Sequence, residues 1–300
     1  MSRRGFLALA LLATATCAPS FGPSDSLITS TRVLAVRAEP AEANPGASVT
    51  FTALVVGPGG TVTDADLDWS FCTAPKPVTE DNVVSSACLT ASALVPAGAG
   101  PTTTAALPVD GCSIFGPDTS SPGLRPRDPD VTGGYYQPLR ASLAGAEDAF
   151  ALARIHCHLA HADAAAANAF AAAYTLNQNP KLLPLHAIAS GAPVELGAIP
   201  SGMRITLEAS WTVDSSEVFA QFDAPSQTLT SQRESMRIAW YASDGVFDTE
   251  STGRAGSDPA TTTDDGWIAP STAGTVHVWL VLRDSRGGVD FATYDLVVVK

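Results

Sequence analysis

Strict alternation of apolar and polar residues is the feature that most constrains how this chain folds. Between positions 203 and 211 every second side chain is apolar, as Met203, Ile205, Leu207, Ala209 and Trp211 alternate with Arg204, Thr206, Glu208 and Ser210. A period of two places one row of side chains on a core and the other in water, as in a half-buried antiparallel strand. This segment is therefore predicted to be a strand of a two-layered β fold.

Further strands are predicted over residues 32–38, 49–55, 67–71, 135–144, 149–159, 238–240, 276–282 and 291–299, and Trp69 is placed to fill a core. Only 16% of the residues are charged, and helix-forming Lys and Glu are scarce, which favours strands and turns. One helix is expected in the alanine-rich run 161–174, where Asp163 near its start suits the helix dipole. The predicted fold class is all-β, with two tandem antiparallel β-sandwiches and one short connecting helix.

Two stretches resemble known modules. The strings RVLAVRAEPAE (32–42) and VTFTALVV (49–56), separated by Pro45-Gly46, look like the start of bacterial Ig-like domains. Together with CAPSFGP (17–23) they are similar to a group of bacterial envelope lipoproteins with Ig-like modules. The string GTVHVWLVLRDSRGG (274–288) resembles Ig-like modules of the PKD type, which are spacer and adhesion modules. The resemblance implies fold and location and carries over no catalytic residue.

The first seventeen residues indicate export. Ser2–Arg4 is cationic, Gly5–Ala13 is a run of nine apolar residues that is too short to span a bilayer, and Thr14–Thr16 precedes Cys17. We interpret Cys17 as a lipidation site that anchors the mature chain to a membrane. The alternative is cleavage earlier, after the Ala13-Thr14-Ala15 step, in which case Cys17 has no such role. Arg3-Arg4 also resembles a twin-arginine export motif.

The expected organisation follows from these segments. Residues 1–16 are a signal peptide, 17–31 a lipidated tether, and 32–160 an Ig-like sandwich with a long disulfide-stapled insertion at about 72–132. Residues 161–179 form a helical connector and 180–300 a second Ig-like sandwich. In an oxidising compartment Cys72, Cys88, Cys112 and Cys157 are expected to form two disulfides, for which three pairings are possible.

Candidate ligand sites are few. His156 and His158 would share one face of a strand and could hold zinc, but Arg154 on the same face opposes a dication, so we interpret them as part of an exposed polar face. Loop aspartates, among them Asp64, Asp66 and Asp68, are interpreted as turn formers. We expect no bound metal and no cofactor.

Trp267 and Trp279 could stack on sugars and are the candidate ligand-binding residues, but packing against a neighbouring strand or loop is the preferred interpretation. Nucleic acid is excluded as a partner by the net charge of −13. No nucleophile elbow, His-Glu-x-x-His, P-loop or dinucleotide motif is present.

Three functions remain open at this point. The first is a non-catalytic binding or scaffolding protein of the bacterial envelope, partnered by envelope proteins or cell-wall glycan and facing the outer membrane or the periplasm. The second is a carbohydrate- or peptidoglycan-binding module. The third is a hydrolase whose site is assembled from scattered loop residues. The first is preferred because modules and an anchor are recognisable and catalytic motifs are not.

Overall fold

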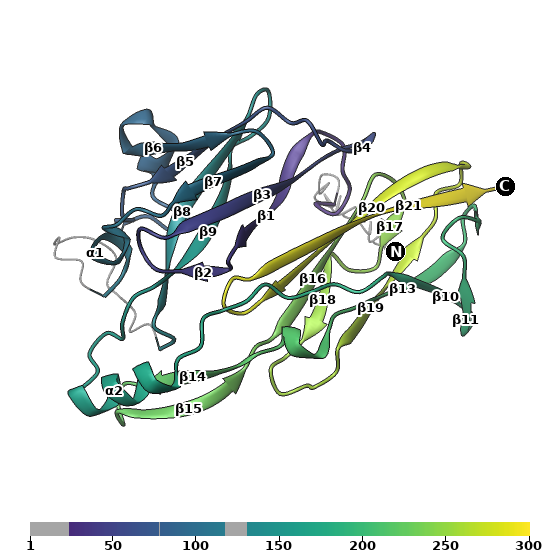
Figure 1. Ribbon diagram of the computed structural model, residues 1–300. Helices are drawn as coiled ribbons and strands as arrows, with labels where there is room; N and C mark the ends of the chain where they lie inside the picture. Colours follow the sequence, from purple (N-terminus) through teal and green to yellow (C-terminus); the bar gives the residue numbers. More distant parts are fainter. Residues whose placement is uncertain (1–23, 78, 118–130) are drawn as a thin grey trace, which may run out of the picture.

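The computed structural model describes residues 24–77, 79–117 and 131–300. Strands, mostly antiparallel, are the main regular structure of this part, and its longest helix is α2 (Ala164–Ala173) (Figure 1). The other helical pieces are short, namely α1 (Gly111–Phe115) and the 3-10 turns η1 (Ser86–Leu89), η2 (Ala91–Ala93) and η3 (Val213–Ser215). The strands form two β-sandwiches, so the predicted all-β class is confirmed.

The first sandwich has one sheet of four strands and one of five. In the smaller sheet the central strand pairs with all three others: β3 (Ser48–Gly57) with β1 (Arg32–Glu39), β4 (Gly60–Thr61) and β7 (Thr102–Ala106). The larger sheet has the order β2 (Glu42–Ala43), β9 (Ala149–His156), β8 (Gly134–Leu143), β5 (Leu67–Cys72) and β6 (Leu94–Ala99). In immunoglobulin terms these are the A-B-E and G-F-C-C′ sheets.

The second sandwich repeats the central part of this topology. One sheet has the order β11 (Ala192–Val194), β10 (His186–Ala189), β13 (Arg204–Ser210), β19 (Thr262–Ile268) and β17 (Val246–Phe247). Its partner has the order β12 (Ile199–Pro200), β21 (Val289–Val299), β20 (Gly274–Asp284), β16 (Met236–Ala242) and β18 (Ser251–Arg254). In the first of these sheets β10, β13 and β19 correspond to strands A, B and E, and the second sheet corresponds to G-F-C-C′, which confirms the Ig-like expectation for both modules.

A buried tryptophan on the C strand centres each core. Trp69 on β5 is 1% exposed and packs with Phe51, whose ring also makes an edge contact with Phe71. Trp240 on β16 is fully buried among the apolar residues of β13 and β20. Because these side chains come from the alternating segments, the period-two pattern fixes which face of each strand is inside.

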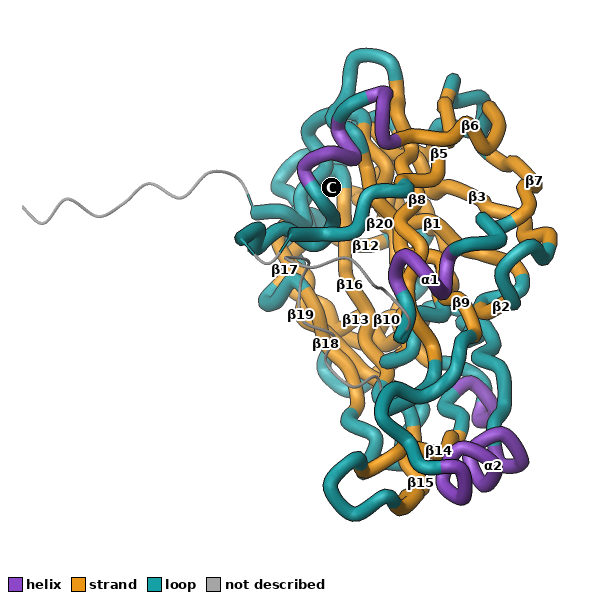
Figure 2. The backbone as a smooth tube through the Cα atoms, turned by 90° about the vertical axis from the view of Figure 1, so that its left-hand side faces the viewer, coloured by secondary structure: helices purple, strands orange, loops and turns teal. Residues whose placement is uncertain are grey.

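An inserted hairpin extends the second sandwich at one end. Strands β14 (Val218–Asp223) and β15 (Thr228–Arg233) pair only with each other among the described strands, and they lie beside α2 (Figures 1 and 2). Phe222 and Phe170 are buried in the cluster between hairpin and helix. The helix begins where the Asp163 side chain accepts a hydrogen bond from the Ala166 backbone at 2.7 Å.

The two sandwiches pack face to face. On the outer face of the first, Leu54 and Val56 of β3 meet Trp279 and Val281 on the outer face of the second, in an apolar cluster that also includes Ile28. The β1–β3 sheet and the β20–β16 sheet are therefore inner layers of the molecule. Burying outer strand faces in this way leaves little freedom for one sandwich to move against the other.

Two segments differ from the predicted organisation. Residues 72–132 contain β6 and β7, so this stretch supplies one strand to each sheet of the first sandwich. Residues 24–31 are not a free tether, because this segment is held on β16. The Ile28 N–H donates to the Ala242 carbonyl at 2.8 Å, and the Ala242 N–H donates to the Ser26 carbonyl at 2.9 Å. The Ile28 side chain is 1% exposed. The chain thus contacts the second sandwich before it forms the first.

Candidate functional site

The segment that joins the sandwiches, residues 174–182, runs past a set of buried charges that we call the junction cluster: Glu42, Arg154, Glu217, Glu234, Asp284 and Arg286. Its side chains come from both sandwiches and from the two residues that flank the inserted hairpin, Glu217 before β14 and Glu234 after β15. Glu217 is partly exposed and the other five residues are buried. Burying an ion costs several kcal/mol unless its charge and hydrogen-bonding capacity are matched. The partners of each charge in the cluster therefore affect how stably the sandwiches and the connecting segment pack together.

Glu42 organises the half of the cluster that belongs to the first sandwich. Its carboxylate is fully buried, lies 3.0 Å from Arg154 Nε, and accepts hydrogen bonds from the Tyr174 hydroxyl and the Asn177 backbone N–H. Burial and the Glu42 charge both raise the pKa of Tyr174, which keeps its hydroxyl protonated as the donor. One short strand thus holds two points of the connecting segment.

Arg286 organises the half that belongs to the second sandwich. It is 2% exposed, donates from Nε to Glu234 at 2.7 Å and from Nη2 to Glu217 at 2.8 Å, and lies 4.8 Å above the Phe219 ring. Its third donor, Nη1, bonds the Thr175 carbonyl at 3.0 Å. The planar guanidinium thereby ties the β20–β21 turn, the hairpin and the connecting segment together.

The charges around Arg286 are unbalanced. Glu217, Glu234 and Asp284 surround one guanidinium, and Asp284 spends its acceptor capacity on the backbone N–H groups of Arg286 and Gly288 at 2.8 and 2.9 Å. Burial and the nearby Asp284 raise the pKa of Glu234 to about 7, and burial raises the pKa of Asp284 as well. A proton shared within this group relieves the excess negative charge.

A groove runs along β9 of the first sandwich, with β1 and residues 283–289 of the second sandwich on its other side. Two adjoining cavities, of about 390 and 520 Å³, share Tyr136 and Leu152, and we call them together the β9 groove. Val83, which is 78% exposed, also lines it. Among the described strands β9 has a second neighbour only at Arg154 and Ile155, where β2 pairs with it. Residues 149–153 therefore present a free strand edge.

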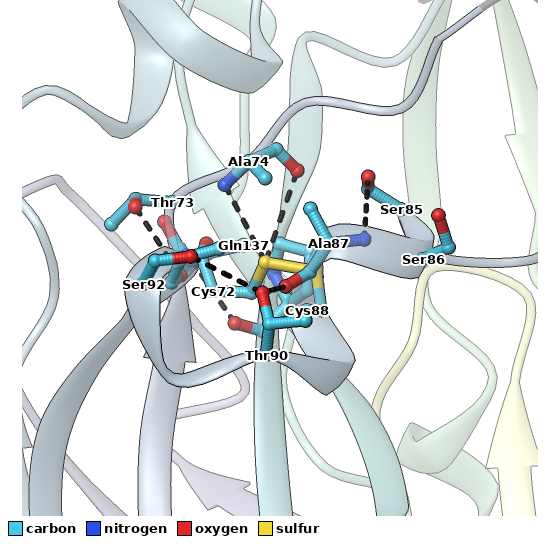
Figure 3. The surroundings of a disulfide bond; sticks show 12 residues. Cys72, Thr73, Ala74, Ser85, Ser86, Ala87, Cys88, Thr90, Ser92 and Gln137 are labelled. Carbon is cyan, nitrogen blue, oxygen red and sulfur yellow. Dashed lines mark hydrogen bonds between the residues drawn. A yellow bond between two sulfur atoms is a disulfide. The ribbon is translucent and has the colours of Figure 1, made fainter.

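The two disulfides predicted from the cysteine count are confirmed, with the pairing Cys72–Cys88 and Cys112–Cys157. Figure 3 shows the first of them where β5 ends, beside Gln137, whose amide donates to the Cys72 carbonyl at 2.7 Å. Pro138 follows in β8 and has no N–H to give its neighbour, so this buried side chain satisfies the carbonyl in its place.

The histidine interpretation needs correction. β9 ends at His156, so His156 and His158 do not form a pair on one strand face. His156 is not part of an exposed face, since it is half-buried with its ring centroid 4.2 Å from that of Tyr174 and its Nδ1 3.8 Å from Glu42. Burial lowers its pKa. Within the described residues, no three His, Cys, Asp or Glu side chains converge as metal ligands.

The tryptophan candidates are also wrong as a sugar-binding surface, because both side chains are fully buried. Trp267 lies in the core of the second sandwich. Trp279 lies between the sandwiches, where its indole N–H donates to the Thr61 hydroxyl at 2.9 Å. The alternation of side chains along β20 places Trp279 on the outer face of its sheet, and the first sandwich covers that face.

Cys17, the predicted lipidation site, lies outside the described residues. Within them, no helix combines the length and the apolar character needed to cross a bilayer. The junction cluster was missed because its members are scattered from Glu42 to Arg286. The only local signal was the charged turn 283–288.

The similarity of this chain to known proteins is low. No protein-family model and no curated protein matches the chain. Among solved structures, the D00-D0 domain of intimin aligns with 90% of this chain and 99% of its own, at 11% identity and a TM-score of 0.26. The Yersinia pseudotuberculosis adhesin InvE aligns with 90% of this chain and 59% of its own, at 13% identity and a TM-score of 0.24. Similarity at this level supports no inference about function.

Proposed function

We propose that this chain is an exported, lipid-anchored envelope protein that binds another envelope protein without catalysing a reaction. The observation that carries the proposal is the junction cluster, in which Glu42 and Arg286 connect both sandwiches to the segment between them. A binding protein benefits from a fixed orientation of its modules, because less motion is lost when the partner docks. The anchor on Cys17 and the export signal support the location.

The β9 groove is the proposed contact surface. The N–H and C=O groups of alternate residues point to the same side of a strand. Arg154 directs these groups away from β8, where β2 pairs with it. Phe150 and Leu152 therefore also direct their N–H and C=O groups away from β8. A free edge beside apolar side chains accepts an extended peptide as an added strand. The proposed partner therefore contributes an extended segment with apolar residues at alternate positions.

Site-specific crosslinking tests the contact. A photoreactive residue in place of Leu152 is activated on intact cells, and the chain is captured through a tag after Lys300 for mass spectrometry. The control carries the same group at Val218, which is 56% exposed and begins the first strand of the inserted hairpin. A protein captured from Leu152 and not from Val218 supports the proposal. Equal capture from both positions, or none from Leu152, refutes it.

The anchor has a separate test. Replacing Cys17 by Ser removes the thiol to which the lipid would be attached. The chain is then expected to leave the membrane fraction and to lose labelling by radioactive palmitate. Cys112→Ser together with Cys157→Ser serves as the control for general loss of cysteines and is expected to keep the label. A Cys17→Ser chain that stays in the membrane fraction would show that the anchor lies elsewhere.

A further inference from the structure

A second cavity, of about 330 Å³, lies on the outer face of the β16–β20 sheet, where the segment that precedes β1 crosses it. Its lining is mostly polar and includes Arg237, Arg283, Tyr241, Ser251, Asp25 and Glu250. This composition is unlike that of the neighbouring contact between the sandwiches, which is apolar. Ligand sites occupy about 300–1,000 Å³, so the cavity suits one small polar ligand.

Two arginines face each other in this cavity. Arg237 and Arg283 are directly opposite in the register of β16 and β20, on the outer face of the sheet. Like charges at opposite positions destabilise a sheet. Within the described residues, neither guanidinium lies within 4.0 Å of a carboxylate; Arg237 donates to the Ser251 hydroxyl at 2.6 Å and Arg283 to the Leu34 carbonyl at 3.3 Å. Neither arginine of the pair therefore forms an ion pair with a described residue.

A third arginine lies beside the pair. Burial and the charge of Arg237 both lower the pKa of the Arg283 guanidinium, so its charged form is disfavoured here and an anion would offset this cost. Arg32 lies 5.9 Å from the centre of the Tyr241 ring, and its Nε is buried without a hydrogen-bond partner. In a chain with a net charge of −13, three arginines gathered around one tyrosine are an exception that an anion would explain.

Two carboxylates also line the cavity and restrict what that anion is. Glu250 accepts hydrogen bonds from the Ser24 hydroxyl and the Asp25 backbone N–H, at 2.6 and 3.1 Å, through one of its oxygens. Its second oxygen and the Asp25 carboxylate are acceptors that repel a compact anion and favour hydroxyl donors. A ligand that suits both halves has a negative group at one end and hydroxyl groups at the other.

We propose that this cavity binds an acidic saccharide, one sugar residue with a carboxylate. The carboxylate accepts hydrogen bonds from the guanidinium groups of Arg237 and Arg283, whose planar donors match its two oxygens. The sugar hydroxyls donate to Glu250 and Asp25, and the Tyr241 side chain contacts the apolar part of the ring. Arg283 also lines the β9 groove, so the two sites adjoin, but this binding site does not depend on a protein partner.

Calorimetric titration of the full chain tests the assignment with three probes: D-glucuronate, D-glucose and inorganic phosphate. Glucuronate is expected to bind at least tenfold more tightly than glucose, which lacks the carboxylate, and more tightly than phosphate, which lacks the sugar hydroxyls. Arg237→Gln is expected to weaken glucuronate binding at least tenfold. Arg233→Gln, an exposed arginine on the inserted hairpin, is the matched control and leaves it unchanged.

Each other outcome overturns the proposal. Glucuronate that binds no better than glucose shows that the arginines do not read a carboxylate. Phosphate that binds as tightly as glucuronate shows an oxyanion site without saccharide recognition. Arg237 is exposed on its strand, so its replacement is compatible with folding, and near-ultraviolet circular dichroism checks this. A folded Arg237→Gln chain with unchanged affinity removes the site from this cavity.

Discussion

Arg286 offers the sharpest test of the junction cluster. Replacing it by Met keeps part of the apolar stem of the side chain and removes the guanidinium. The Glu234 carboxylate, on a residue that is 1% exposed, then loses the cation that lies 2.7 Å away, and the Thr175 carbonyl loses its donor. The contact of the guanidinium with the Phe219 ring is lost as well.

The expected loss follows from the burial of both partners. Removing one member of a buried ion pair costs about 3–5 kcal/mol, since the other charge stays desolvated. A domain is stable by about 5–15 kcal/mol, so this is a large fraction. Urea unfolding followed by tryptophan fluorescence measures the difference. Arg204→Met is the control, because its ion pair with Asp248 is exposed and is worth at most about 1 kcal/mol.

A double variant decides whether the charge is the cause. Glu234→Gln neutralises the carboxylate that Arg286→Met strands, so the two changes together are expected to cost less than the sum of their separate effects. Strict additivity, or a loss of less than 1 kcal/mol for Arg286→Met alone, would refute the idea that a buried charge balance holds the junction.

Three further expectations concern the disulfides, the pH dependence and the contact between the sandwiches. Replacing Cys112–Cys157 by serines is expected to cost about 4 kcal/mol in urea unfolding and replacing Cys72–Cys88 about 3, because the residues are 45 and 16 positions apart. The pKa of Glu234 is raised from 4.5 to about 7, so its contribution is fully present below pH 4.5 and is lost as the pH rises through 7. Relative to Glu234→Gln, the stability of the unmodified chain should fall over this range by roughly 3 kcal/mol, and equal pH profiles would contradict this. Trp279→Ala is expected to cost about 3–5 kcal/mol in thermal unfolding, and a loss below 1 kcal/mol would mean that the contact between the sandwiches contributes little.

The strands with a strong period of two were predictable, and the weakly patterned ones were not. β13 and β20 carry large apolar residues at alternate positions, which fixes both the strand and its buried face. β7 and β15 have no such row, since most of their side chains are small or polar and exposed. Their pairing depends on neighbours supplied by the rest of the fold, and this information is not local.

The junction cluster and the arginine cavity lay beyond sequence reasoning for a different reason. Alternation tells which face of a strand is apolar, but not what covers the other face. Trp279 and Arg283 share the outer face of β20, and only the packing of the first sandwich buries Trp279 and leaves Arg283 beside a cavity. Glu42 and Arg286 are likewise ordinary polar residues until the connecting segment passes between them.

The contact of Ile28 with Ala242 also determines how the molecule would carry mechanical load. A pull applied between residue 24 and Lys300 enters the β16–β20–β21 sheet through this contact and leaves it at the end of β21. The first sandwich, residues 32–156, lies outside that path as long as the contact holds. Two backbone hydrogen bonds to Ala242, the hydrogen bonds of Ser24 and Asp25 to Glu250 and the buried side chain of Ile28 form a short clip. We expect this clip to yield first under tension and only then to expose the disulfide-bonded sandwich to force.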